Sequence, residues 1–447
     1  MTEILDQTDL TERAERLVLA ARHAGATASD AVCVRGIALS VEVRMGKVEE
    51  TRRAEGDDFA LRVFVGKRSA TVSANVFTDP AALAERAVAM AKVAPEDKYA
   101  GLPDKDRLAQ SFPDLDLLDV TLPTADELTR AALAAEDAAR SVQGVTNSGG
   151  ASSGWSLGGL VLATSDGFAG SYLGSHFGHS ASAIAGSGTQ MERDYDGESK
   201  VHRGDLMDPA KIGRNAGERA VKRLNPRQMA TGRATVVYDP RISRGLVGHL
   251  SGAINGASIA RKTSFLQAKM GRQIFPKTVQ ITDDPIRPRA LGSRPFDGEG
   301  VPGVPLAVIK DGVLMTWFLD SATARELGLT TNGRAARDGG GTSPSSSNLT
   351  LLPGEKSPQE LIAEIDHGFY ATELIGHGAN LISGDYSRGA AGFLIEKGVL
   401  SHPVSEITIA GNLNDMFARM VVANDLEYKF AMNAPTIVIE GLTIAGR

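Results

Sequence analysis

Residues 39–53 read LSVEVRMGKVEETRR, and in this stretch apolar and polar side chains alternate on both sides of a Met-Gly pair. A period of two is typical of a β-strand with one buried face and one wet face, because successive side chains of a strand point to opposite faces. Similar segments fill residues 30–76, with turn residues at Gly46, Gly56-Asp57-Asp58 and Gly66-Lys67. The sequence therefore predicts an antiparallel meander.

Helices are predicted before and after this meander. The first should start near Asp9, with Glu12 completing a capping box, and stop at Gly25. A second capping box is expected at Thr124 and Glu127. Three helices should open with an Asp N-cap followed by proline, at Asp79-Pro80, Asp208-Pro209 and Asp239-Pro240. Short helices are expected near 321–327 and 357–372.

The rest of the chain contributes more strands and the connections between them. Residues 95–123 contain four prolines and little periodicity, which indicates an ordered connection between subdomains. Residues 144–190 are rich in Gly and Ser, but small residues alternate with larger apolar ones, so strands are expected. We expect an N-terminal α+β region over 1–230, subdivided near 95–123, and a strand-rich C-terminal domain over 231–447. Clustered strands beside helices, without strict alternation, favour the α+β class.

Bulk composition restricts the function classes. The 447 residues carry a net charge of −6, which disfavours a direct nucleic-acid ligand. The single cysteine, Cys33, lies in an apolar run and is expected to be a small buried side chain, so no disulfide is predicted. The N-terminus is polar and no apolar run approaches the roughly 20 residues of a membrane span. We expect a soluble cytoplasmic protein that does not associate with membranes.

Common catalytic motifs are missing from the sequence. None of the eight histidines forms a pair with the spacing of a helical zinc-protease motif. His176 and His179 are three apart in an expected strand, so they should face opposite sides. Arg261 replaces the glycine that a phosphate loop requires before Lys262, and no Gly-x-Ser-x-Gly elbow occurs. No metal ligand or catalytic residue is assigned, although a site assembled through space stays open.

One helix has an unusual glycine pattern. Residues 244–265 read RGLVGHLSGAINGASIARKTSF, and the spacing predicts a helix with a stripe of Gly245, Gly248, Gly252, Gly256 and Ala260. Each interior glycine costs about 0.5–1 kcal/mol relative to alanine, so we expect close packing against this face. The close neighbour could be a strand or helix of the same chain, the wall of a groove or another subunit. His249 lies off the stripe.

Several motifs of the chain resemble the TldD/PmbA family, the "modulator of DNA gyrase" type, and within it the PmbA (TldE) branch. They are SGAINGASIARKTSF, ISGDYSRGAAGFLIEKG, PVSEITIAGNLNDMF and IEGLTIAG, all between residues 251 and 446. The resemblance implies an α+β fold and a cytoplasmic two-subunit metalloprotease. In the TldD branch a helix at this place carries His-Glu-x-x-x-His and binds zinc. The corresponding positions here are Val247, Gly248 and Gly252, none of which can bind a metal.

The resemblance therefore implies a subunit that lacks the catalytic zinc and pairs with a zinc-bearing TldD-like chain to act on unfolded or small peptides. An isolated chain could instead form a homodimer. Residues of the family-like motifs are candidates for shaping the cleft or the partner contact: Gly245, Gly256, Asn255, Arg261, Lys262, Thr263, Asp385, Tyr386, Arg388 and Asn412. For Asp385 and Arg388 the alternative is an internal salt bridge. Two other functions stay open, a non-proteolytic binding or modulator protein and a self-sufficient hydrolase with an unrecognised site.

Overall fold

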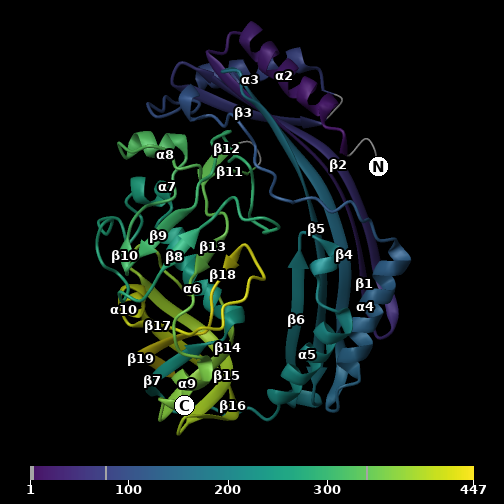
Figure 1. Cartoon of the computed structure of the whole chain (residues 1–447), viewed down its shortest axis with the longest axis vertical. Helices are drawn as coiled ribbons and strands as arrows, with labels where there is room; N and C mark the ends of the chain where they lie inside the picture. Colours follow the sequence, from purple (N-terminus) through teal and green to yellow (C-terminus); the bar gives the residue numbers. More distant parts are fainter. Residues whose placement is uncertain (1–4, 76–77, 339–340, 447) are drawn as a thin grey trace.

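The computed structural model describes residues 5–75, 78–338 and 341–446. The α+β class is confirmed, with an N-terminal sheet that arches beside a strand-rich C-terminal region (Figure 1). The N-terminal sheet is antiparallel, in the order β3-β2-β1-β4-β5-β6. Its strands are β1 (Ala28–Arg44), β2 (Lys47–Val65), β3 (Arg68–Asn75), β4 (Val145–Thr164), β5 (Ala169–Ala185) and β6 (Glu192–Lys200).

The predicted meander is confirmed, with glycines of positive φ in the turns at Gly46 and Gly66. The predicted turn at Gly56-Asp57-Asp58 is wrong, because β2 runs through it without a break. Gly56 instead pairs with Gly36 of β1, which pairs with Gly158 of β4, which pairs with Gly174 of β5. A row of glycines across four strands removes side-chain crowding, which lets long strands bend together.

Four helices cover the convex face of this sheet. The odd-numbered residues of β1 pack against α2 (Thr8–His23) near one end and against α4 (Ala125–Arg140) near the other. Helix α3 (Pro80–Val93) covers β2 and β3, and α5 (Pro209–Lys222) covers β5 and β6. Cys33 belongs to this core and is fully buried, as expected. The opposite, concave face is left for the C-terminal region.

The predicted helix caps are confirmed, with one exception. Asp79, Asp208 and Asp239 each accept backbone N–H groups at a helix start, and Thr124 and Glu127 form a capping box. The first helix has no such box, because it begins one residue earlier than expected and Asp6 accepts the Thr8 N–H.

The C-terminal region is built around a small barrel. Its strands are β7 (Gly232–Tyr238), β14 (His367–Ile375), β15 (Asp385–Glu396), β16 (Val399–Asn412), β17 (Met420–Val422) and β19 (Ile437–Ala445). They follow the order β16-β15-β14-β7-β19-β17, and pairing of β16 with β19 closes the barrel. The predicted helix over 357–372 is too long, because α9 (Pro358–Ala363) ends and the chain enters β14 at His367.

A second, five-stranded sheet lies beside the barrel, in the order β10-β9-β8-β13-β18. Its strands are β8 (Ile281–Asp283), β9 (Leu306–Lys310), β10 (Val313–Leu314), β13 (Leu349–Leu351) and β18 (Met432–Asn433), and β11 (Ala335–Asp338) pairs with β12 (Gly341–Pro344). The remaining helices are α6 (Pro240–Ala253), α7 (Gly256–Ala260), α8 (Ser321–Glu326) and α10 (Leu413–Ala418).

The glycine-bearing helix is shorter than predicted. Helix α6 ends at Ala253, and Asn255 caps a separate helix, α7. The predicted stripe from Gly245 to Ala260 is therefore divided between two helices. Leu246, Val247 and Leu250 of α6 lie in the core that joins the barrel to the five-stranded sheet.

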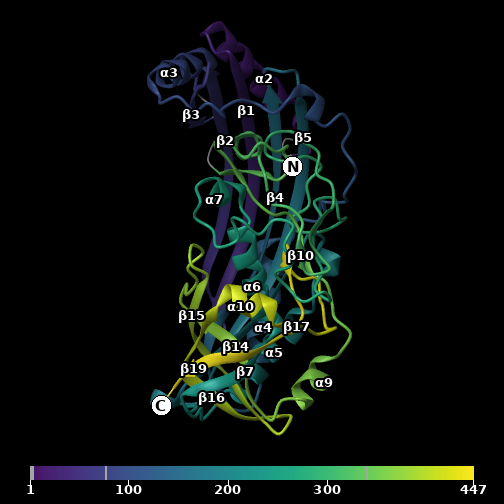
Figure 2. The same ribbon diagram turned by 90° about the vertical axis from the view of Figure 1, so that its left-hand side faces the viewer.

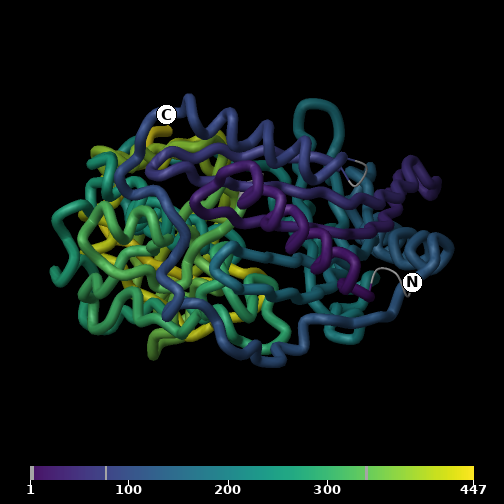
Figure 3. Tube along the Cα trace, turned by 90° about the horizontal axis from the view of Figure 1, so that it is seen from above, coloured from purple at the N-terminus to yellow at the C-terminus, as the bar shows by residue number. Residues whose placement is uncertain are grey.

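Residues 95–123 connect α3 to α4 and run along the C-terminal region, as the tube in Figure 3 shows. The Arg325 guanidinium donates to the carbonyl oxygens of Tyr99, Gly101 and Leu102 in this segment. In the side view, the long strands β1, β2, β4 and β5 run along much of the molecule and extend beyond the strands of the C-terminal region (Figure 2). Within the described ranges no helix is long and apolar enough to traverse a lipid bilayer.

Candidate functional site

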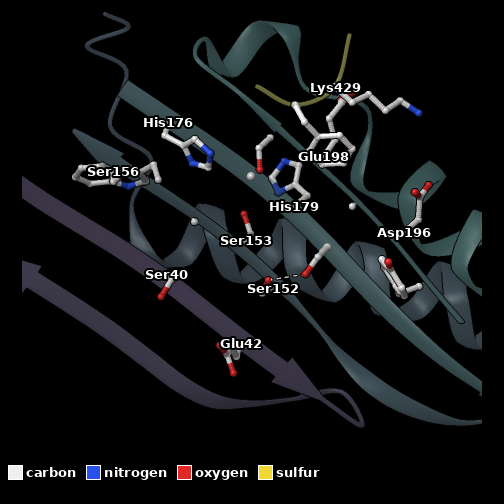
Figure 4. A pocket seen from close by; sticks show the side chains of 18 of the residues that line it. Ser40, Glu42, Ser152, Ser153, Ser156, His176, His179, Asp196, Glu198 and Lys429 are labelled. Carbon is white, nitrogen blue, oxygen red and sulfur yellow. Dashed lines mark hydrogen bonds between the residues drawn. The ribbon is translucent and has the colours of Figure 1, made fainter. Parts of the chain in front are cut away.

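A groove of about 520 Å³ lies between the concave face of the N-terminal sheet and the C-terminal region (Figure 4). Its sheet wall consists mainly of small side chains, from Ala38, Ser40, Ser152, Gly154, Ser156, Gly178, Ser180, Gly197 and Ser199. The opposite wall is provided by Arg241 and Arg244 of α6 and by Lys429 and Phe430. Residues far apart in the sequence therefore form one site.

The small residues of the groove follow from strand alternation. In β4 the odd-numbered residues Trp155 and Leu157 are buried under the helices, whereas the even-numbered Gly154 and Ser156 face the groove. Gly154 also pairs with Gly178 of β5. A wall without large side chains leaves room for an extended chain to lie close to the sheet.

The wall opposite the sheet is held in place by polar contacts. Arg241 pairs with Asp194 of β6 at 2.8 Å, and the Arg244 guanidinium lies 3.9 Å from the Phe430 ring centroid. Lys200 donates to the Tyr428 carbonyl oxygen at 3.2 Å. The Asn433 side chain accepts the backbone N–H groups of Lys429 and Phe430, both at 2.9 Å. The loop over residues 428–430 is thus held by Lys200 of β6 and by Asn433.

The three positions of α6 that the family resemblance aligns with a metal motif carry no metal ligand. Val247 is buried in the core, and Gly248 and Gly252 carry no ligand atom. His249 packs edge-on against Tyr386, with ring centroids 5.9 Å apart, and burial together with Arg388 lowers the pKa of its imidazole. Among the described residues no three His, Cys, Asp or Glu side chains converge as a metal site would require. These residues do not fit a zinc ion.

The glycines of the predicted stripe differ in their surroundings. A Cβ atom on Gly245 would meet nothing within 4 Å, and one on Gly248 would lie 3.6 Å from the Met432 sulfur. On Gly252 it would lie 2.9 Å from a Leu381 methyl group, and on Gly256 only 2.6 Å from the Phe318 carbonyl oxygen. Close packing therefore explains Gly256 and contributes at Gly252, but it does not explain Gly245.

The other predicted residues of this segment lie at the start of α7 and in the turn that follows it. Asn255 caps α7 and donates to the Pro344 carbonyl oxygen. Arg261 and Thr263 are exposed, and Lys262 is exposed with a φ of 60°.

The predicted residues of β15 and β16 lie together at one end of their ladder. Asp385 pairs with Asn412 in register, and the Asn412 amide donates to its carboxylate at 3.2 Å. Tyr386 is buried. Arg388 donates to the carbonyl oxygens of Leu374 and Ile375, and no ion pair with Asp385 is present in the described part of the chain. The salt bridge considered as an alternative for Asp385 and Arg388 is therefore wrong.

None of these predicted residues lines the groove. Sequence reasoning missed the groove residues, although the alternation of small and large side chains over 144–190 was their signal. His176 lines only the groove, whereas His179 lines both the groove and a smaller cavity on the helix-covered face. The two histidines face opposite sides of β5, as the strand period predicts.

Three family models match almost the whole chain. They are described as PmbA/TldA metallopeptidase domain 1, central domain and C-terminal domain, and they match residues 29–91, 117–224 and 231–446. The chain belongs to the PmbA/TldD metallopeptidase family.

Curated members of this family match over the full length. The chain is 34% identical to Metalloprotease PmbA of Escherichia coli O157:H7, covering 100% of this chain and 98% of the other. It is 33% identical to a Metalloprotease PmbA homolog of Haemophilus influenzae, covering 98% and 97%.

Solved structures of the family share the fold. A protein described as a modulator of DNA gyrase from Bacteroides thetaiotaomicron superposes with a TM-score of 0.91 at 27% identity, covering 99% of this chain and 100% of the other. TldE from Thermococcus kodakarensis has a TM-score of 0.85 at 21% identity, covering 97% and 99%, and shows the fold alone.

Proposed function

We propose that this chain is the non-catalytic, PmbA-type subunit of a two-chain metalloprotease, which pairs with a zinc-bearing TldD-like chain. The complex would act in the cytoplasm on unfolded or small peptides. The observation that carries this proposal is the composition of α6, where Val247, Gly248 and Gly252 stand at the positions of the partner's metal motif.

The groove supports a role in holding the substrate. An extended peptide presents backbone N–H and C=O groups along both edges, and it needs a shallow wall that its side chains do not clash with. The Gly and Ser residues of β4 and β5 provide such a wall, and their hydroxyl groups can donate or accept hydrogen bonds. Glu42 and Lys429 add opposite charges to the lining.

The test compares this chain alone, a TldD-like chain alone and the two mixed, each with metal analysis and cleavage of an unfolded peptide. We expect no stoichiometric zinc in this chain, zinc in the TldD-like chain, and full cleavage only in the mixture. Stoichiometric zinc and full activity in the lone chain would overturn the proposal in favour of a self-sufficient hydrolase. Failure to form a complex, with retained binding to another protein, would favour a modulator.

A further inference from the structure

Arg244 lines the groove, and its guanidinium has no acidic partner among the described residues. It follows Arg241 by three residues on α6, and both belong to the wall opposite the sheet. Arg241 is fully engaged, since it pairs with Asp194 at 2.8 Å and with Asp239 at 3.2 Å. The Nε atom of Arg244 donates to the Arg241 carbonyl oxygen at 3.3 Å, whereas its two terminal nitrogens bond to no described residue. Arg244 is partly exposed, so a ligand in the groove can reach it.

The ring of Phe430 holds this guanidinium in place. The central carbon of the Arg244 guanidinium lies 3.9 Å from the ring centroid, which is a cation–π contact. A stacked guanidinium keeps its edge free, and the edge formed by its two terminal nitrogens matches the two oxygens of one carboxylate. Phe430 is itself held, because the Asn433 side chain accepts its backbone N–H at 2.9 Å. The donor pair of Arg244 is therefore arranged before a ligand binds.

Two of the three carboxylates in the described lining belong to the helix-covered side of the sheet. Glu198 of β6 lies in register with His179 of β5, which lies in register with Ser153 of β4. Ser153 is two residues from Trp155, so this row is on the face that the helices cover. The Glu198 carboxylate accepts a backbone N–H from the segment before α5 at 2.7 Å. It is thus engaged away from Arg244.

The other two carboxylates do not neutralise Arg244 either. Asp196 precedes Glu198 by two residues on β6 and pairs with Arg219 of α5 at 2.8 Å. Glu42 belongs to β1, which is separated from β6 by β4 and β5. Three strand spacings amount to about 14 Å, so Glu42 lies across the sheet from β6, the strand to which α6 is tied.

Lys429 adds a second positive charge beside Arg244. It precedes Phe430 in the sequence and lines the groove, on a segment separate from the strands of the sheet (Figure 4). Its ion pair with Glu427 at 2.7 Å is a surface pair, since the Glu427 side chain is 66% exposed. Surface pairs are weak, so the ammonium group can turn to a ligand at little cost. The wall formed by α6 and this loop therefore carries uncompensated positive charge.

We propose that Arg244, stacked on Phe430 and assisted by Lys429, binds a carboxylate group of the peptide in the groove. The two terminal nitrogens of Arg244 donate to the two carboxylate oxygens. The inference rests on the proposed role of the groove in holding the substrate, and it names the substrate class. The complex would prefer peptides that place an acidic side chain or a free C-terminus at Arg244. Both sources present the same chemistry, and the test separates them.

The test measures peptide binding to the lone, full-length chain by isothermal titration calorimetry, so it needs neither zinc nor a partner. The probes are two matched pairs of acetylated alanine pentapeptides. The first pair ends in a free carboxylate or in an amide. The second pair is amidated and carries glutamate or glutamine as its third residue. We expect the carboxylate member of at least one pair to bind at least about tenfold more tightly than its amide counterpart.

Two variants make the assignment specific. Arg244→Gln should abolish the difference within the pair and leave the affinity of the amide member unchanged, because it removes the charge alone. Arg244→Lys should retain part of the difference, since it keeps the charge but loses the paired donors. The control, Arg214→Gln, removes an exposed arginine of α5 outside the groove and should preserve the whole difference. Thermal unfolding of each variant controls for folding.

The outcomes distinguish this inference from the proposed function. A gain in the first pair alone would identify a peptide C-terminus, a gain in the second alone an acidic side chain, and a gain in both would show that the site accepts either. Equal binding within both pairs, or a difference that survives in Arg244→Gln, would overturn the carboxylate site and leave the role of the groove intact. Absence of binding by all four peptides would overturn both the carboxylate site and the proposed role of the groove.

Discussion

Arg337 of β11 forms a 2.7 Å ion pair with Asp30 of β1, and so joins the C-terminal region to the N-terminal sheet. Arg62 of β2 pairs with the same carboxylate and also donates to Thr342 of β12 at 2.9 Å. Burial would raise the pKa of the Asp30 carboxyl, but the two guanidinium groups outweigh it and the pKa is lowered. One buried anion thus holds two buried cations at the junction of the two regions.

Replacing this carboxylate should weaken the junction strongly. Asp30→Asn leaves Arg337 buried without its counter-charge and leaves Arg62 with only the more distant Glu299, so we expect the free energy of unfolding to fall by about 3–5 kcal/mol. Urea denaturation measures the change. Glu364→Gln, which removes an exposed partner of Lys356, is the control and should have little effect. A loss at Asp30 no larger than at Glu364 would contradict the prediction.

Stability should also depend on pH through Glu299, which lies 3.8 Å from Arg62. Burial raises the pKa of this carboxyl from 4.5 to about 7, although the nearby Arg62 guanidinium acts to lower it. The folded state therefore holds its proton more tightly than the unfolded state does. The contribution of this group to stability is fully present below about pH 4.5 and is lost as the pH rises through about 7.

The variant Glu299→Gln cannot titrate, so its free energy of unfolding should fall less than that of the wild type between pH 5 and pH 7, the window set by this pKa shift. Denaturant unfolding at several pH values measures both slopes. Burial also raises the pKa of Asp297, so part of the pH dependence of stability should survive in the variant. Identical slopes for the two proteins would refute a raised pKa at Glu299.

Helix packing on the convex face should not tolerate a methyl group at Gly213 of α5. A Cβ atom there would lie 1.8 Å from the Ala135 carbonyl oxygen of α4, and backbone cannot move aside as a flexible side chain can. We expect Gly213→Ala to cost about 1–3 kcal/mol or more. Gly245→Ala on α6 meets nothing within 4 Å, so it should stabilise by about 0.5–1 kcal/mol. Thermal unfolding of both variants should show shifts of opposite sign.

Blocking the groove should reduce cleavage by the proposed two-chain complex. Ser156 lies between Ala38 and His176 in register on the groove wall, so Ser156→Tyr would fill space that an extended peptide needs. We expect kcat/KM to fall at least about tenfold, which corresponds to about 1.4 kcal/mol, with the zinc content of the complex unchanged. The control, Thr51→Tyr, changes an exposed residue of β2 outside the groove. Equal activity of the two variants would show that peptides do not pass over this wall.

Helix starts were predictable because their signals are local. An Asp side chain that caps a helix bonds to an N–H two or three residues ahead, so the Asp-Pro pairs at 79, 208 and 239 fixed their helices without reference to the rest of the fold. The errors arose where distant pairing outweighs local preference. Gly56-Asp57-Asp58 resembles a turn, yet cross-strand pairing with Gly36 keeps the strand extended.

The candidate site was less predictable for the same reason. The groove draws on β1, β4, β5, β6, α6 and the loop before β18, and no sequence spacing connects segments so far apart. The family-like motifs of residues 251–446 contain turns and helix caps, such as the caps at Asn255 and Asn412, and do not contain the residues that line the groove.

The sequence by itself determined the α+β class, the family and the lack of metal ligands at Val247, Gly248 and Gly252, because residue type and local period carry that information. Only the tertiary structure decided which small residues line the groove and that Ser153, His179 and Glu198 share a row. Strand register makes the difference. A shift of one residue would turn every side chain to the opposite face, and the register is set by packing over the whole sheet.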